Sequence, residues 1–476
     1  MASTFGGINT ALSSLYAQRR GLDITGQNIA NANTEGYTRQ RIRMQSQTGS
    51  LNPGVYSTTD QVGNGVTVAA IERGRNQYLE DRGRTEHASS AYLANTKGTY
   101  DQVESVLAEP SDTALQARLH DMWDGWNDVA NNWQDPSTRS ALIERSHTVA
   151  TTLNDTYTSL SHHFDDQHNQ MDAYVTQVNT MAAGIADMNN QIAIAQKAGL
   201  PANELQDERD RQVMQLSELS GATAILKDDG TANVYIGNVG LVEGFNARSL
   251  ELAGPGTLDE VMASGDKVSL KWTDTDTDAS AGGTMGAMLD SMNTLLPGIV
   301  KDLDSVAKGI ADTVNGTMSA GYTIDGKPGD GSDPDVPLFF DGTTAAKIKV
   351  ALTDASQVAF SQGNPDMNGT DPSLDHYNAD KLSGMGVDPN GPDATYQSMI
   401  GRLGVSAQAT ARRSEIQDSV TDQVDSARQG ESGVNLDEEM THLLTYQRGY
   451  EAASRVLTTI DSMLDQLINR TGLVGR

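Results

Sequence analysis

Three histidines that lie close together, His162, His163 and His168, form the densest histidine group in this 476-residue chain. No carboxylate–histidine ligand spacing accompanies them, so a solvated or interhelical role is favoured over a metal site. The sequence also has no GxxxxGKS/T phosphate loop, no GxSxG nucleophile elbow and no HExxH zinc pair. It has no cysteine, which excludes disulfides, thiolate metal sites and cysteine nucleophiles. We therefore predict a protein that is not an enzyme.

Three alternating aspartates, Asp274, Asp276 and Asp278, resemble the first half of a calcium-binding loop. The sixth position of such a loop should be glycine and the twelfth a bidentate glutamate. This chain has Ala279 and Met285 there, so a solvent-exposed turn is the favoured interpretation. The sequence therefore predicts neither a bound metal nor a cofactor.

The net charge of −29 and the isoelectric point near 4.5 count against two classes of partner. Nucleic-acid binding needs a basic surface, and an anionic membrane repels an acidic protein. The sequence contains no run of 18 apolar residues, the length needed to span a bilayer, and its N-terminus lacks the pattern of a cleavable signal peptide. Residues 1–46 carry a charge of +3, residues 431–476 carry −3, and residues 221–400 carry −16. The two ends are therefore complementary in charge, and the centre is acidic.

Both ends of the chain show an apolar repeat of alternating three- and four-residue steps, the spacing of a coiled-coil helix, with an interruption at Arg19 in the first. The N-terminal seam consists of Phe5, Ile8, Leu12, Leu15, Leu22 and Ile29. The C-terminal seam consists of Leu443, Tyr446, Tyr450, Ala453, Leu457, Ile460, Leu464 and Leu467. We expect these two helices to pair and to bring the ends of the chain together at one pole.

Further helical periodicity fills much of the chain between them. A seam runs from Leu115 to Trp133, and a helix of about 54 residues, or about 80 Å, is predicted to follow from Leu142. A shorter helix is expected to stop at Gly221. Two more segments, at 285–310 and 396–429, complete the helical part, and the last should end at Gly430.

Short β-prone runs separated by glycine and aspartate turns follow residue 221. We predict a mainly α fold with a β-rich insert, α+β in class, in an elongated multidomain molecule. Residues 1–60 and 431–476 would form a terminal coiled-coil domain. Residues 70–220, 284–320 and 396–430 would form a long-helix bundle. Residues 221–283 and 321–395 would form the β-rich, acidic and surface-exposed insert, which we expect to project at the pole opposite the termini. In its second half the best predicted strand is KIKVAL, at 347–352.

Two polar segments border the terminal helices. The first is asparagine-rich, and its asparagines and glycine predict a helix exit with a specified turn. Its characteristic residues are Asn28, Asn31, Asn33, Thr34, Gly36, Tyr37, Arg39 and Gln40. In the second, Asn435 is predicted to cap a helix and Glu438 to return a capping hydrogen bond, with acids suited to the positive end of the helix dipole.

These two segments together resemble the terminal motifs of the bacterial flagellar axial proteins, the family of rod, hook and hook-associated proteins. The resemblance rests on the eight residues just named and on Asn435-Leu436-Asp437-Glu438-Glu439-Met440 with the Tyr446-Gln447-Arg448 run. Hook proteins typically carry Ser-Lys-Glu where this chain has Asp437-Glu438-Glu439, so the hook-associated members are the better match. The motifs cover about 90 residues, and the acidic middle, 221–400, resembles nothing recognisable.

The resemblance implies a structural subunit joining the flagellar hook to the filament and required for filament assembly. It implies export unfolded through the flagellar type III apparatus, aided by an export chaperone, to an extracellular position after a transient cytoplasmic stage. The implied partners are further copies of the chain in a ring or helical assembly, the hook protein and a second hook-associated junction protein. The terminal helices are expected to be disordered in the free monomer and to order on assembly, since an isolated helix pair is marginal in water.

Two other functions remain open at this point. The chain could be a hook or distal-rod protein, although its helical block after residue 75 differs from the β-rich region of hook proteins. It could also be a secreted adhesin or enzyme carried on flagellar-type ends. Binding of carbohydrate or a catalytic pocket within residues 221–400 would favour that alternative.

Overall fold

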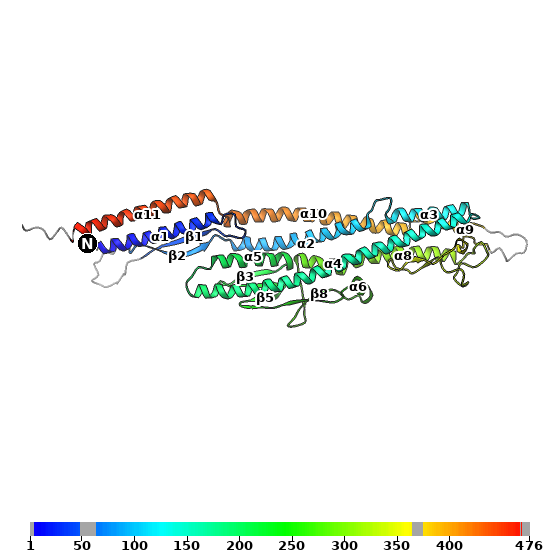
Figure 1. Ribbon diagram of the computed structural model, residues 1–476, viewed down its shortest axis with the longest axis horizontal. Coiled ribbons are helices and arrows are strands. Elements are labelled where there is room, and N and C mark those ends of the chain that lie inside the picture. Colours follow the sequence, from blue (N-terminus) through cyan, green and yellow to red (C-terminus); the bar gives the residue numbers. More distant parts are fainter. Residues whose placement is uncertain (1–3, 48–62, 364–374, 467, 469–476) are drawn as a thin grey trace, which may run out of the picture.

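The computed structural model describes residues 4–47, 63–363, 375–466 and 468. The molecule is elongated, and its long helices lie side by side along the longest axis (Figure 1). The first and last helices lie together at one end, next to the helical bundle that occupies the rest of the length. The predicted fold class, mainly α with a β-containing insert, is confirmed.

The terminal helices α1 (Thr4–Ala30) and α11 (Leu436–Asp465) run antiparallel. Their register is fixed by close approaches at two glycines. A Cβ atom on Gly7 would lie 3.1 Å from Ile460, and one on Gly21 would lie 2.8 Å from the ring of Tyr446. A side chain at Gly21 would overlap the Tyr446 ring, and one at Gly7 would have to displace Ile460, so the helices pack closely at both positions.

A two-stranded antiparallel hairpin follows α1 and packs against it. It consists of β1 (Gln40–Ser46) and β2 (Val66–Arg73), with a bulge between Arg43 and Met44. Sequence reasoning did not predict this hairpin. Alternating side chains in both segments were the available signal, but the long connection between the strands hides the pairing.

The bundle contains a helix of 62 residues, α4 (Pro136–Lys197), which is longer than the predicted one and contains it. Asp135 caps its start by accepting a hydrogen bond from the Ser137 amide at 2.9 Å, and Pro136 occupies the first turn. The other helices of the bundle are α2 (Gln77–Leu107), α3 (Leu115–Asn131), α5 (Asn203–Ser220), α7 (Gly283–Asp290), α8 (Leu296–Met318) and α10 (Pro392–Ser432), with a π-helical turn at Ser291–Leu295.

Two predicted helix ends were wrong. α10 continues through Gly430 to Ser432, because the chain keeps helical geometry there and Ser432 donates to the Arg428 carbonyl at 2.8 Å. α3 stops at Asn131, so Trp133 lies beyond the helix, where its ring stacks on Phe360 at 5.5 Å. The predicted stop at Gly221 is confirmed, since this residue has φ +69° and ends α5 in the left-handed conformation.

One continuous apolar core runs along α3, α4, α7 and α8. Its largest fully buried side chains include Trp126, Phe164, Leu119, Met122 and Leu153. Each such side chain stabilises the fold by about 1.5–3 kcal/mol relative to an exposed one. On α2 the core includes only residues from Val103 onward, and on α10 only residues up to Leu403. The first part of α2 and the last part of α10, which lie beyond the core, contact each other largely through polar side chains.

The strands of 221–283 form two small antiparallel sheets against the bundle. The first has the order β3-β4-β5-β6 and the second the order β7-β8-β9. Their bounds are β3 (Thr223–Leu226), β4 (Ala232–Ile236), β5 (Val239–Glu243), β6 (Asn246–Ala247), β7 (Leu250–Ala253), β8 (Ser269–Trp272) and β9 (Asp278–Ala279), with helix α6 (Leu258–Ser264) between β7 and β8. These sheets lie along the flank of α4, not at the pole opposite the termini as expected (Figure 1). The reason is that Val234, Leu241 and Trp272 join the bundle core.

Residues 321–395 contain less strand than expected in the part that is described. A single antiparallel pair, β10 (Phe340–Asp341) with β11 (Lys349–Val350), stands where the KIKVAL strand was predicted. Helix α9 (Tyr377–Ser383) and two 3-10 turns, Ala355–Gln357 and Gly384–Val387, complete the segment. Within the described residues, no helix is both long and apolar enough to cross a membrane.

Candidate assembly site

The N-terminal seam lies along one side of the α1–α11 contact. Ile8, Leu15, Leu22 and Ile29 are half-buried, and Leu12 is 37% exposed. The side chain of Phe5 lies outside the described residues. The fully buried positions of α1 are mostly small, namely Ala11, Ala17, Gly21, Ile24, Thr25 and Asn28. The periodicity identified the large side chains, whereas the close helix approach selects small ones, so apolar surface remains open on α1.

The C-terminal seam faces α1 more directly. Ala453 is buried, and Leu443, Tyr446, Leu457, Ile460 and Leu464 are half-buried. Tyr450 is 41% exposed, and Leu467 lies outside the described residues. Large apolar side chains also stand outside the seam, since Leu436, Met440 and Leu444 each expose about half of their surface. The helix pair therefore has more apolar surface than the two helices bury against each other.

Asn28 connects the end of α1 to the returning chain and to α11. Its amide donates to the Gln40 carbonyl at 2.9 Å and to a Glu439 carboxylate oxygen at 3.0 Å. Its oxygen accepts from the Gln40 amide at 3.0 Å and from the Tyr37 hydroxyl at 2.8 Å. Because Asn28 is 1% exposed and uses every hydrogen-bonding site, no other side chain could replace it here.

Arg39 joins the two ends of the chain by ion pairs. Its guanidinium contacts Glu439 at 2.7 Å and Glu438 at 2.6 Å, and both Arg39 and Glu439 are nearly fully buried. Glu438 thus pairs with Arg39 and does not return the predicted capping bond, and this contact lowers its pKa. Asn435 does cap α11, as predicted, by accepting from the amides of Asp437 and Glu438.

The remaining motif residues build the turn. Asn31 donates to the Gln27 carbonyl at 3.0 Å and accepts from Thr34 at 3.1 Å. Gly36 has φ +80°, a conformation that glycine adopts without strain, and Asn33 is exposed. Burial, followed by nearby carboxylates, raises the pKa of Tyr37 to about 12, so its hydroxyl stays protonated and can donate to Asn28.

The turn is anchored to the bundle through α5. The Thr38 amide donates to Asp207 at 3.1 Å, Gln40 accepts from Asn203 at 3.0 Å, and Glu204 accepts from Gln40 at 3.2 Å. Sequence reasoning missed these residues. The alternating charges of Asp207-Glu208-Arg209-Asp210-Arg211 were the available signal, but a charged stretch on a helix is ordinarily solvated.

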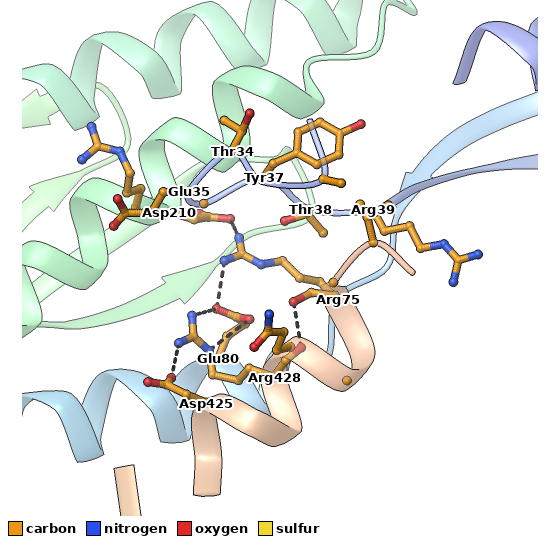
Figure 2. A pocket seen from close by; sticks show the side chains of 18 of the residues that line it. Thr34, Glu35, Tyr37, Thr38, Arg39, Arg75, Glu80, Asp210, Asp425 and Arg428 are labelled. Carbon is orange, nitrogen blue, oxygen red and sulfur yellow. Dashed lines mark hydrogen bonds and ion pairs between the residues drawn. The ribbon is translucent and has the colours of Figure 1, made fainter. Parts of the chain in front are cut away.

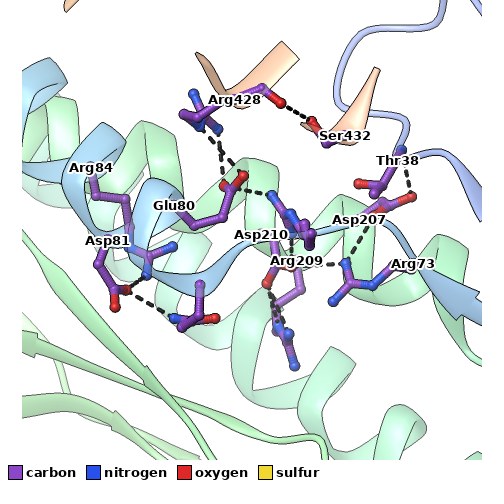
Figure 3. Close-up of polar contacts among 12 residues, drawn as sticks. Thr38, Arg73, Glu80, Asp81, Arg84, Asp207, Arg209, Asp210, Arg428 and Ser432 are labelled. Atoms are coloured by element: carbon purple, nitrogen blue, oxygen red, sulfur yellow. Dashed lines mark hydrogen bonds and ion pairs between the residues drawn. The ribbon is translucent and has the colours of Figure 1, made fainter. Parts of the chain in front are cut away.

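Asp210 is the centre of a buried ionic cluster (Figure 3). It accepts from Arg73 at 2.9 Å, from Arg209 at 2.8 and 3.0 Å, and from Arg75. Burial alone would raise its pKa, but the three guanidinium groups outweigh burial and hold the pKa below the ordinary value. The cluster fixes the segment after β2 onto the bundle.

The ionic contacts continue from α2 to α5 and α10. Glu80 accepts from Arg75 at 2.9 Å and from Arg428 at 3.0 Å. His87 lies between Glu218 at 2.9 Å and Asp425 at 2.8 Å. The pKa of His87 is raised, mainly by its hydrogen bond with Glu218. Burial opposes this increase, and the contact with Asp425 adds to it. His87 therefore connects three helices, α2, α5 and α10, and its raised pKa favours the charged imidazole in this position.

These groups line a polar cleft of about 780 Å³ between the terminal helices and the bundle (Figure 2). Its walls come from the motif turn, α5, the starts of α2 and α11, and the end of α10. The charged groups at its centre are already paired with one another, so the cleft is a joint between two parts of the chain.

The other candidate residues lie elsewhere. His163 is buried in the bundle beside Gln167, at 3.0 Å, and burial lowers its pKa. Asp274 and Asp276 sit in an exposed turn, paired with Arg248 and Lys271. Across the part of the chain that the structure describes, no group of three or more candidate ligands could hold a metal ion.

Comparison with known proteins agrees with this arrangement. Residues 100–331 match the model of the flagellar hook-associated protein FlgK helical domain. Residues 8–38 match that of the flagella basal body rod protein, and 428–470 that of the flagellar basal body rod FlgEFG protein C-terminal region. The flagellar hook-associated protein 1 of Bacillus subtilis (strain 168) is 30% identical over 525 aligned positions, covering 100% of both chains.

This chain belongs to the flagellar hook-associated protein 1 family. A second member, from Salmonella typhimurium, is 26% identical and covers 97% of this chain and 99% of its own. The solved structure of the flagellar hook junction protein FlgK from Burkholderia pseudomallei aligns with a TM-score of 0.60. It covers 73% of this chain and 99% of that chain at 16% identity, which supports the shared fold. The family consists of structural proteins of the bacterial flagellum.

Proposed function

We propose that this protein is the structural subunit that joins the flagellar hook to the filament, and that filament assembly requires it. The observation that carries the proposal is the full-length similarity to hook-associated protein 1. The terminal helix pair supports it, because apolar surface on α1 and α11 remains open after the two helices have paired. The protein would act by assembly and not by catalytic turnover.

In the assembled structure, α1 and α11 would form the inner layer, as the terminal domain of residues 1–60 and 431–476. The bundle of residues 70–220, 284–320 and 396–430 would form the next layer. The acidic insert of residues 221–283 and 321–395 would form the outer surface, since excess negative charge is best accommodated in water. Both sets of seam residues would serve this inner-layer packing.

The partners follow from this position. Copies of the chain would contact one another, with the hook protein on one side and a second hook-associated junction protein on the other. Export through the type III apparatus, with an export chaperone, would carry the chain from the cytoplasm to the outside of the cell. The terminal helices would order only on assembly, because a lone two-helix contact is marginal in water.

The inner-layer role can be tested by a substitution in the C-terminal seam. Leu457 is half-buried on the α1-facing side of α11, and Leu457→Asp would place a charge there at a cost of about 2–5 kcal/mol. We expect the variant to be exported but not assembled, so cells would carry hooks without filaments. The matched control is Thr458→Asp, one residue along and exposed, which should assemble. Normal filaments with Leu457→Asp would refute the role.

The position at the junction can be tested by deleting the gene. Electron microscopy should then find bare hooks, and flagellin should accumulate in the culture medium. Loss of the hooks themselves would move the protein into the rod or hook. Intact flagella would sink the proposal and leave an adhesin or enzyme function to pursue.

A further inference from the structure

The exposed face of α10 is a basic surface in an acidic protein. Between Asp393 and Glu415 this helix carries three arginines and no acid, whereas the whole chain has a net charge of −29. Arg402 is neutralised by Asp302 of α8, at 2.7 Å. Arg412 and Arg413 are exposed and form no ion pair among the described residues. Glu415 beside them is also exposed, so this stretch keeps one excess positive charge that is available to an outside partner.

The same face also exposes apolar side chains. Val405 is 71% exposed and Ile416 is 66% exposed, and their spacing of eleven residues places both on one side of a helix. Gly401 and Gly404 have open space where a side chain would stand, although glycine weakens a helix interior. A partner could therefore approach the helix backbone closely. We name the set of Val405, Arg412, Arg413 and Ile416 the basic face of α10.

A groove extends this surface toward the bundle. It has a volume of about 720 Å³ and lies between α2, α8 and α10. Its apolar walls include Leu295, Ile299, Met399 and Leu403. Apolar anchors beside a charged strip are the combination found at specific protein interfaces, so the groove and the basic face form one candidate interface.

The complementary charge lies on another part of the same molecule. Residues 221–283, which form the two small sheets and α6, contain ten acids against four lysines or arginines. Asp228, Asp266 and Asp276 among them are exposed. α10 runs along one long edge of the molecule and these sheets lie along the opposite edge (Figure 1). Two copies side by side could thus place opposite charges in contact.

We infer that the basic face of α10 docks on the acidic sheet layer, residues 221–283, of a second copy of this chain. This inference rests on the proposed function, which requires copies to surround a common axis. The contact is heterologous, since a different surface of each copy takes part, and such contacts close into rings or continue into helices. Charge complementarity sets the orientation of neighbours, and the apolar side chains supply contact area.

The first test reverses the charges in cells that lack the native gene. Arg412→Glu combined with Arg413→Glu changes the charge of the basic face by −4, so this face would repel the acidic layer. We expect at least about ten-fold fewer filaments. The variant should be secreted at the normal level. The matched control is Lys308→Glu with Lys347→Glu, which makes the same charge change outside both surfaces and should support normal filaments. Normal filaments with the arginine variant would overturn the inference.

The second test identifies the partner directly. Arg412→Lys with Arg413→Lys keeps the charge and supplies amines that a carbodiimide can couple to carboxylates in contact with them. In isolated flagella, coupling should link these lysines to acids of residues 221–283 in a second copy. Flagella that mix ¹⁵N-labelled and unlabelled subunits would distinguish links between two copies from links within one copy. Links to a different protein, or no links in intact flagella, would overturn the inference. The proposed function fails separately, if the gene deletion leaves filaments in place.

Discussion

Replacing Asp210 by asparagine should release the hairpin segment from the bundle. Its side chain is 6% exposed and forms ion pairs with Arg73, Arg75 and Arg209. Asp210→Asn keeps the shape but removes the carboxylate paired with Arg209, and it leaves Arg73 with Asp207 and Arg75 with Glu80 as their remaining carboxylate partners. Removing one partner of a buried ion pair costs about 3–5 kcal/mol. Local opening of the β1–β2 hairpin should therefore become about 150- to 5,000-fold more populated.

The assay is amide hydrogen exchange in the full-length chain, read at β1, at β2 and at the start of α2. Glu208→Gln is the matched control on the same helix, because Glu208 is 43% exposed and its pair with Arg211 lies at the surface. A surface pair contributes less than about 1 kcal/mol, so exchange in the control should change less than ten-fold. Equal effects of the two substitutions would refute the argument that burial makes Asp210 important.

The pH dependence of the same contact has a definite sign. The folded-state pKa of Asp210 is held below the ordinary value, so the cluster stabilises the fold above the ordinary aspartate pKa of about 3.9. That stabilisation is lost as the pH falls through the lower, folded-state pKa. Hairpin protection should be constant near neutral pH and should fall in acid, and Asp210→Asn should remove this acid-dependent part.

Two further outcomes can be checked on the purified chain or in cells. Gly21→Ala should weaken the terminal helix pair by about 1–3 kcal/mol, because the added Cβ would overlap the Tyr446 ring. Gly26 has open space around it, so Gly26→Ala should instead stabilise the helix by up to about 1 kcal/mol. Counting filaments should therefore show a loss for the first substitution only. The pKa of His87 is raised, so its ion pairs stabilise the fold fully below the ordinary histidine pKa of about 6.5 and lose this effect as the pH rises through the folded-state pKa. The thermal midpoint should therefore fall as the pH rises from about 6.5, and a flat profile in the wild type would contradict this.

The helices of the bundle could be predicted because their signals are local. The end of α5 depends on Gly221, which lies directly after the last helical residue. Asp135 and Pro136 are an equally local signal at the start of α4, although the predicted helix began only at Leu142. Apolar periodicity also located the core-facing residues of α3, α4 and α8, since a wide buried face needs large side chains. The strands after Gly221 were visible for the same reason, as short runs between glycine turns.

The joint between the terminal helices and the bundle could not be predicted in the same way. The ion pair of Arg39 with Glu439 joins residues 400 positions apart, and no local pattern indicates which charges meet. The register of α1 was also hidden, because a close approach at Gly21 buries small residues that periodicity does not count. The resemblance to flagellar proteins identified Asn28 and Arg39 as important, and the structure provides the contacts that explain why.

The most direct measurement of the protein's position uses the absence of cysteine from the chain. Ser332 is exposed in residues 321–395, the part of the proposed outer layer that lies outside the proposed contact between copies, so Ser332→Cys would supply a unique thiol there. Intact flagella from cells carrying this variant would be labelled with maleimide-coupled gold and viewed by electron microscopy. We predict one narrow band of gold at the boundary between hook and filament. Gold distributed along the hook or the filament, or absent from flagella that carry filaments, would contradict the proposed role.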